Sequence, residues 1–128
     1  MFRPRIIPVL LLKDQVLVKT TRFSNPKYIG DPINAVKIFN DLKTDELVFL
    51  DINATREQRC ISVDFVREVG EEANMPFAVG GGITTIEQIR TLISAGAEKV
   101  IIGSKAAQEN DFIRNASDTF GASTIVAC

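Results

Sequence analysis

The chain has 128 residues, enough for one domain with a hydrophobic core. Its hydrophobic content of 45% and charged content of 24% argue against a disordered or fibrous protein. The 15 Lys and Arg residues nearly balance the 16 Asp and Glu residues, so nothing in the charge favours nucleic acid or an anionic membrane as a partner.

The chain contains no histidine, so any proton transfer would depend on carboxylates, lysines or the substrate itself. Cys60 and Cys128 lack the spacing of metal ligands and are too few for a secreted disulfide framework. We therefore expect no metal, no cofactor and a reducing, cytoplasmic compartment. The apolar run Ile6–Leu12 contains Pro8 and is much shorter than a membrane span, so it predicts a buried strand.

Short apolar runs predict five strands along the chain. Most of these runs are continuous rather than alternating, which is typical of a parallel sheet covered on both faces. Val16–Thr21 alternates and predicts a strand or an extended loop, and Arg22–Gly30 has the composition of a long loop. The five runs are Ile6–Leu12, Leu47–Ile52, Phe77–Val79, Val100–Ile102 and Thr124–Ala127.

Apolar residues at helical spacing predict four helices between these strands. Asp31-Pro32 predicts an N-cap followed by proline at the first helical position, and Thr84 with Glu87 predicts a capping box. Gly96 and Gly121 are placed to end helices in a left-handed conformation. The four apolar stripes are Ile33, Val36, Phe39 and Leu42; Val63, Val66, Val69 and Ala73; Ile86, Ile89, Leu92 and Ile93; and Phe112, Ile113, Ala116 and Phe120.

Four strand–helix units and the start of a fifth strand predict an α/β protein with a parallel sheet. A complete (βα)8 barrel of the TIM type needs roughly 250 residues, so residues 1–128 would form about half of one, as a single (βα)4 domain. A small doubly wound open sheet satisfies the same pattern.

Two glycine-containing turns carry the strongest functional signal. Gly80, Gly81 and Gly82 directly follow a predicted strand and precede a capped helix, so their backbone N–H groups could approach an anion closely. Gly103 and Ser104 follow the next strand, where they would offer a backbone N–H and a hydroxyl. Parallel strands would bring both turns to one sheet edge, which predicts a phosphate cradle; the alternative is two ordinary tight turns.

Charged residues stand at both ends of the predicted strands. Asp51 ends an apolar strand, where it could face a ligand, meet a fixed cation or bond to loop backbone, and Lys19 could reach an anionic substrate. Arg5, Glu46 and Lys99 each precede a strand and predict a salt-bridge cluster at the opposite end of the sheet.

These residues together resemble the histidine-biosynthesis barrel family, and most closely the cyclase subunit of imidazole glycerol phosphate synthase. The resemblance runs from the first strand to the last residue. Its motifs are Arg5-Ile6-Ile7, Lys13-Asp14, Val18-Lys19, Gly30-Asp31-Pro32, the run from Asp45 to Ile52, the run from Pro76 to Ile83, and Gly96-Ala97-Glu98-Lys99-Val100.

The resemblance implies the N-terminal half of a (βα)8 barrel that accepts ammonia from a glutaminase partner. Its substrate would be a bis-phosphorylated nucleotide precursor, which is split and cyclised into imidazole glycerol phosphate and an aminoimidazole carboxamide ribotide.

By the same resemblance, one substrate phosphate would be bound at the turns that contain Gly81, Gly82, Gly103 and Ser104. The family usually has asparagine at position 103. Lys19 would lie on the loop that closes over substrate. The resemblance further assigns Arg5, Glu46 and Lys99 to an ammonia gate and Glu98 to a contact with the glutaminase.

Two departures from the family pattern concern catalysis. The catalytic aspartate expected at the end of the first strand is replaced by Leu11, and the second is expected just after Cys128. We therefore expect the chain alone to lack cyclase activity. Leu11 with Pro8 resembles a paralogous subgroup that delivers ammonia for acetamidino-sugar formation in surface-polysaccharide biosynthesis. A further alternative is a non-catalytic phosphate-binding half-barrel that closes a barrel as a homodimer.

Overall fold

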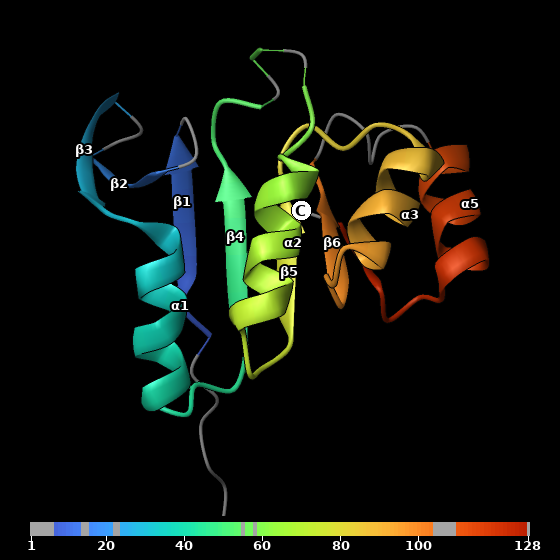
Figure 1. Ribbon diagram of the computed structural model, residues 1–128. Helices are drawn as coiled ribbons and strands as arrows, with labels where there is room; N and C mark the ends of the chain where they lie inside the picture. The colour runs from blue at the N-terminus through green and yellow to red at the C-terminus, as the bar shows by residue number, and fades with distance from the viewer. Residues whose placement is uncertain are drawn as a thin grey trace, which may run out of the picture.

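The computed structural model describes residues 7–13, 16–21, 24–54, 56–57, 59–103 and 110–127. Strands and helices alternate after an initial group of three strands (Figure 1). In chain order the elements are β1 Val9–Lys13, β2 Val16–Thr21, β3 Ser24–Gly30, α1 Pro32–Asp41, β4 Leu47–Asp51, α2 Val63–Glu72, β5 Phe77–Gly80, α3 Ile86–Ser94, β6 Lys99–Ile102, α5 Asn110–Phe120 and β7 Ile125–Ala127.

One seven-stranded sheet in the order β3-β2-β1-β4-β5-β6-β7 organises the chain. The five strands β1, β4, β5, β6 and β7 pair in parallel, while β2 and β3 form an antiparallel extension beside β1. Helices α1, α2, α3 and α5 contact one another in succession along the sheet (Figure 1). This arrangement confirms the predicted parallel α/β fold, consistent with half of a (βα)8 barrel.

Residues Ser24–Gly30 form an edge strand, so the prediction of a long loop from 22 to 30 was wrong for these residues. Pro26 and Gly30 gave the segment a loop-like composition, but an edge strand tolerates proline because its outward N–H needs no partner. The pairing of β3 with β2 is irregular, with register shifts at two places.

The first parallel strand begins later than its apolar run suggests. β1 starts at Val9 rather than Ile6, and Pro8, which has no N–H to donate, instead accepts a hydrogen bond through its carbonyl from Val48. The other four predicted strands are confirmed with ends that shift by one residue, which is the usual uncertainty of such boundaries.

The core lies between the sheet and the helices. Leu47, Phe49, Val100 and Ile102 are buried on this face, and the Phe49 ring meets those of Phe65 and Phe77 edge to face, at centroid distances of 5.4 Å and 6.5 Å. Their buried positions alternate with less buried ones, as they must on a pleated strand.

The opposite face of the sheet carries an apolar row that no described element covers. The strand register aligns Leu11, Leu50, Gly80, Ile101 and Val126 across the five parallel strands. Val126 is 39% exposed, and Val9, on the same face, is 54% exposed. The continuous apolar runs predicted a sheet covered on both faces, whereas the described residues cover one.

Helix ends follow local sequence signals. Asp31 caps α1 by accepting a hydrogen bond from the N–H of Ile33 at 2.8 Å, with Pro32 next, as predicted. The predicted capping box of Thr84 with Glu87 was one residue out of place: Thr85 and Gln88 form it. Thr84 donates from its N–H to the same Gln88 side chain.

The two glycines predicted to end helices have the expected conformation. Gly96 follows α3 with φ of 127°, and Gly121 follows α5 with φ of 97°. Both values lie where side chains are unfavourable and glycine is not, which confirms the prediction.

Asn40 joins two helices through its amide group. Its Nδ2 donates to the carbonyl of Glu72 at 2.8 Å, and its Oδ1 accepts from the N–H of Asn74 at 2.9 Å. Both bonded groups lie at the C-terminal end of α2, where helix carbonyls lack intrahelical partners.

Replacing Asn40 by alanine should lower the free energy of unfolding by about 1–2 kcal/mol, because the part-buried carbonyl of Glu72 and the exposed N–H of Asn74 both lose their partner. Asn34→Ala, at an exposed position of the same helix, is the control for the change in helix propensity. Urea denaturation of the two variants measures the difference; equal stabilities would contradict the role of Asn40.

Candidate functional site

The carboxyl ends of β4, β5 and β6 bring the predicted site residues to one edge of the sheet. Asp51 is the last residue of β4, Gly81 and Gly82 follow β5, and Gly103 follows β6. Because these neighbouring strands are parallel, the two glycine turns lie at the same edge, as predicted. Ser104 lies outside the described residues.

Gly81 and Gly82 are required by the packing of this chain on itself. Their φ angles are 136° and 66°, in the region that favours glycine. A Cβ on Gly81 would lie 2.8 Å from the Cβ of Asp51, and a Cβ on Gly82 would overlap the carbonyl oxygen of Arg59. These two glycines are therefore explained without a ligand.

Gly80 belongs to β5 rather than to the turn, which corrects its predicted position. It is buried, and a Cβ there would lie 2.9 Å from Leu50 and 3.0 Å from Ile101 on the uncovered face.

Gly103 differs from the other glycines at this edge. It is exposed, its φ lies outside the left-handed region, and no described atom lies within 4 Å of where its Cβ would be. Neither packing nor backbone conformation within the described chain requires glycine there. The described residues therefore leave the space beside Gly103 open.

Asp51 forms an ion pair with Arg59 at the end of β4. The Asp51 side chain is only 4% exposed; its Oδ2 lies 2.5 Å from Nη1 of Arg59, and its Oδ1 accepts from Nη2 at 3.3 Å. Oδ1 also accepts from the N–H of Asn53 at 3.1 Å. Two of the three possibilities predicted for Asp51, a fixed cation and the loop backbone, are therefore realised together.

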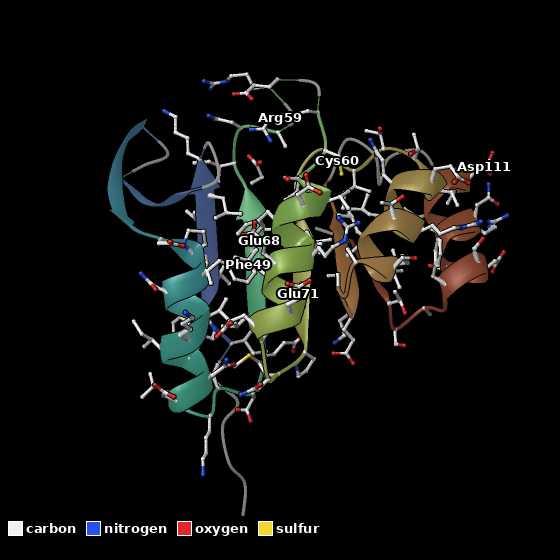
Figure 2. All side chains as sticks on the ribbon, in the orientation of Figure 1. Phe49, Arg59, Cys60, Glu68, Glu71 and Asp111 are labelled. Carbon is white, nitrogen blue, oxygen red and sulfur yellow. The ribbon has the colours of Figure 1, made fainter. Side chains whose placement is uncertain are left out.

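Arg59 has a second carboxylate partner. Its Nε donates to Oε2 of Glu57 at 2.6 Å. The hydrogen bonds to Asp51, which have the larger effect, and to Glu57 raise the pKa of the guanidinium above its ordinary value. Arg59 and Glu57 were missed from the sequence. Figure 2 shows Arg59 in the loop at the carboxyl end of β4.

Asp51 and Leu11 lie on opposite faces of the sheet. Asp51 lies two residues after Phe49, so its side chain is on the same face of the sheet, toward the helices. Leu11 pairs in register with Leu50, which is on the uncovered face. Among the described residues of β1, β4, β5, β6 and β7, no carboxylate lies on the same face of the sheet as Leu11.

Lys19 lies in β2, beside β1. Its backbone pairs in register with that of Lys27 in β3, so the predicted loop position is part of an antiparallel strand pair.

The opposite edge of the sheet holds two of the three residues predicted to form a salt-bridge cluster, Glu46 and Lys99. The Lys99 Nζ lies 3.7 Å from Oε1 of Glu46, whose side chain is 6% exposed. Glu98 precedes Lys99, is exposed, and donates its N–H to the carbonyl of Phe77 at 2.9 Å. Arg5 lies outside the described residues.

The remaining chemistry of the described residues is limited. Burial raises the pKa of the Cys60 thiol to about 11, so it is protonated and weakly nucleophilic near neutral pH. In this part of the chain, no cluster of three or more His, Cys, Asp or Glu residues is arranged to hold a metal ion. None of its helices is both long enough and apolar enough to cross a membrane.

A parallel sheet with helical crossovers and glycine turns at its carboxyl edge is consistent with half of a (βα)8 barrel. The model of the family described as "Histidine biosynthesis protein" matches residues 5–128, and the chain belongs to this family.

Three relatives illustrate the match. The imidazole glycerol phosphate synthase subunit HisF of Endomicrobium trichonymphae is 48% identical, over 95% of this chain and 47% of its own. That of Streptococcus sanguinis is 42% identical, over 98% of this chain and 50% of its own. A protein of Pseudomonas aeruginosa, provisionally named imidazole glycerol phosphate synthase subunit hisF2, is 47% identical, again over 98% and 50%. The chain thus spans about half the length of these relatives.

Replacing Asp51 by asparagine should lower the free energy of unfolding by roughly 1–3 kcal/mol, because the buried partner of Arg59 loses its charge. Asp64→Asn is the matched control: Asp64 pairs with Arg67 on the exposed side of α2, and its loss should cost at most about 0.5 kcal/mol. Guanidinium denaturation of both variants tests the difference. Equal effects would show that the Asp51–Arg59 pair is no more important than a surface pair.

Proposed function

We propose that this chain acts as the N-terminal half of an ammonia-accepting, phosphate-binding (βα)8 barrel like the cyclase subunit of imidazole glycerol phosphate synthase. The family match over residues 5–128 and the relatives of twice the length support this. The uncovered apolar face of the five parallel strands is the observation that carries the half-barrel, because the interior of a barrel is filled by such side chains.

The proposed ligand is a phosphorylated sugar or nucleotide precursor, bound by one phosphate group at Gly81, Gly82, Gly103 and Ser104. Two facts support this: the turns after β5 and β6 share one edge, and no described atom lies within 4 Å of where a Cβ on Gly103 would be. Backbone N–H groups at such turns suit an anion. Lys19 is proposed as a further substrate contact, supported by the position of β2 next to β1.

The opposite edge of the sheet is proposed as the entry for ammonia from a glutaminase subunit. Arg5, Glu46 and Lys99 would form the gate, and Glu98 would contact the partner. The Lys99–Glu46 pair and the exposure of Glu98 at this same edge support the assignment. A buried carboxylate held by a lysine suits a gate, since rearranging one ion pair opens a polar path.

The amidination of an acetamido sugar is a second candidate, favoured by Leu11. A leucine cannot exchange a proton, and the neighbouring side chain in its row, Leu50, is also apolar. The proposed cyclase reaction would need an acid or base at position 11. Delivery of ammonia to a site elsewhere would not need one at this position.

Phosphate binding is tested at Gly103, because no described residue occupies the space that a side chain at this glycine would fill. We expect Gly103→Val to weaken binding of inorganic phosphate at least about five-fold by blocking close approach to the backbone, with little change in melting temperature. Ala122→Val adds similar bulk at an exposed position before β7 and should leave the affinity unchanged.

Isothermal titration with inorganic phosphate measures both variants against the unaltered chain. Equal affinities for all three would place the ligand elsewhere, and no binding by the unaltered chain at tens of millimolar phosphate would contradict the proposed site.

A non-catalytic, self-associating half-barrel is the third candidate. The same apolar row supports it, and among the described strands β7 has a neighbour on one side only. Two copies could cover each other's exposed face and close one barrel with duplicated phosphate sites.

On this reading the chain should sediment as a dimer, at twice its 14.1 kDa. Val126→Lys places a charge on the uncovered face and should shift the equilibrium toward monomer. Glu71→Lys adds the same side chain on α2, pointing away from the sheet (Figure 2), and should not. A monomeric unaltered chain at high concentration would contradict self-association.

A further inference from the structure

The loop between β4 and α2 covers the glycine turn after β5. The carbonyl oxygen of Arg59 occupies the space where Gly82 would carry a Cβ, and the N–H of Ile61 donates to the carbonyl of Gly81 at 2.9 Å. Asp51, at the start of this loop, lies beside Gly81: a Cβ on Gly81 would be 2.8 Å from the Cβ of Asp51. The conformation of the turn is therefore set by a neighbouring segment rather than by its own residues alone.

Arg59 fixes that loop at two points. Its N–H donates to the carbonyl of Ala54 at 2.9 Å, and its guanidinium is bound by the buried carboxylate of Asp51. The backbone hydrogen bond and the side-chain ion pair both connect Arg59 to residues at the start of the loop, Ala54 and Asp51. As a result, the Arg59 carbonyl is held against Gly82 by interactions that a residue without a guanidinium could not fully reproduce.

We propose that Arg59 is a positioning residue for phosphate binding: through its ion pair with Asp51 and its own carbonyl, it holds Gly81 and Gly82 in the conformation that receives the anion. This inference rests on the proposed phosphate site. Pre-organised backbone donors bind more tightly because the cost of ordering them is met before the ligand arrives.

Direct binding of the anion by Arg59 is the alternative. Against it, Nη1, Nη2 and Nε already donate to two carboxylates, whose two negative charges outweigh the single positive charge of the guanidinium. A phosphate that bound Nε would displace Glu57, the more exposed partner. Glu57→Gln therefore separates the two roles.

The experiment follows the amide signals of Gly81 and Gly82 by NMR while inorganic phosphate is added, and determines the melting temperature of each variant. Arg59→Ala should weaken phosphate binding by about ten-fold in the folded protein, and Arg59→Lys, which keeps one charged donor, should give an intermediate affinity. Arg67→Ala removes the exposed partner of Asp64 and should leave the affinity unchanged.

A merely structural role for Arg59 would lower the melting temperature and leave the affinity of the folded protein at the level of the unaltered chain, which would overturn the proposal. If Arg59→Ala does not fold, the affinity of Arg59→Lys decides in the same way. Binding at least five-fold tighter in Glu57→Gln would show direct contact and also overturn it. Failure of the unaltered chain to bind phosphate would refute the site itself.

Discussion

Parallel pairing of five strands in one register is the constraint on which every other feature of the chain depends. Parallel neighbours must be joined by crossovers, so each strand starts at one edge of the sheet and ends at the other. Asp51, Gly81 and Gly103 share the carboxyl edge for this reason, although they lie far apart in sequence. Glu46 and Lys99 are held at the other edge, roughly 15 Å away for strands of this length. A ligand site at one edge and a gate at the other are therefore separated by the sheet itself.

The same register divides the side chains between two faces of unequal environment. Phe49 and its buried neighbours are covered by helices, whereas the row through Leu50 and Ile101 is apolar and has no cover in the described part of the chain. Strands of this composition suit a sheet that is enclosed on both sides. The relatives that the chain matches are about twice its length.

The β2–β3 pair adds a restriction on how a barrel could close at β1. Residues Leu11–Lys13 of β1 pair with β2 along the edge that faces away from β4. A closing strand would therefore pair with the earlier residues of β1 or replace β2 at the later ones. Antiparallel pairing here keeps the outer edge of β1 from being a long unpaired template.

Features set by adjacent residues could be predicted from the sequence, and those set by the path of a loop could not. The cap at Asp31 needs only the residues that follow it, and its prediction was correct. The capping box was misplaced by one residue because Thr84 and Thr85 are equivalent as hydrogen-bonding side chains, and only the start of α3 distinguishes them. Ser24–Gly30 is a strand because β2 lies beside it, a tertiary fact that overrides its composition. Arg59 was missed for a similar reason: its partner Asp51 is eight positions away, and only the course of the loop brings them together.

The candidate site shows why a residue type alone is a weak guide to function. The glycine run was the strongest sequence signal for a ligand, yet Gly81 and Gly82 are already required by their contacts with Asp51 and Arg59. Gly103 is a less conspicuous residue, but no contact with the described residues requires a glycine there. It is therefore the better evidence for a ligand at this edge. Asp51 shows the converse: it is a buried carboxylate at the carboxyl edge, but both oxygens are bound and its side chain faces the helices. It cannot substitute for the acid absent at Leu11, because strand alternation places the two side chains on opposite faces of the sheet.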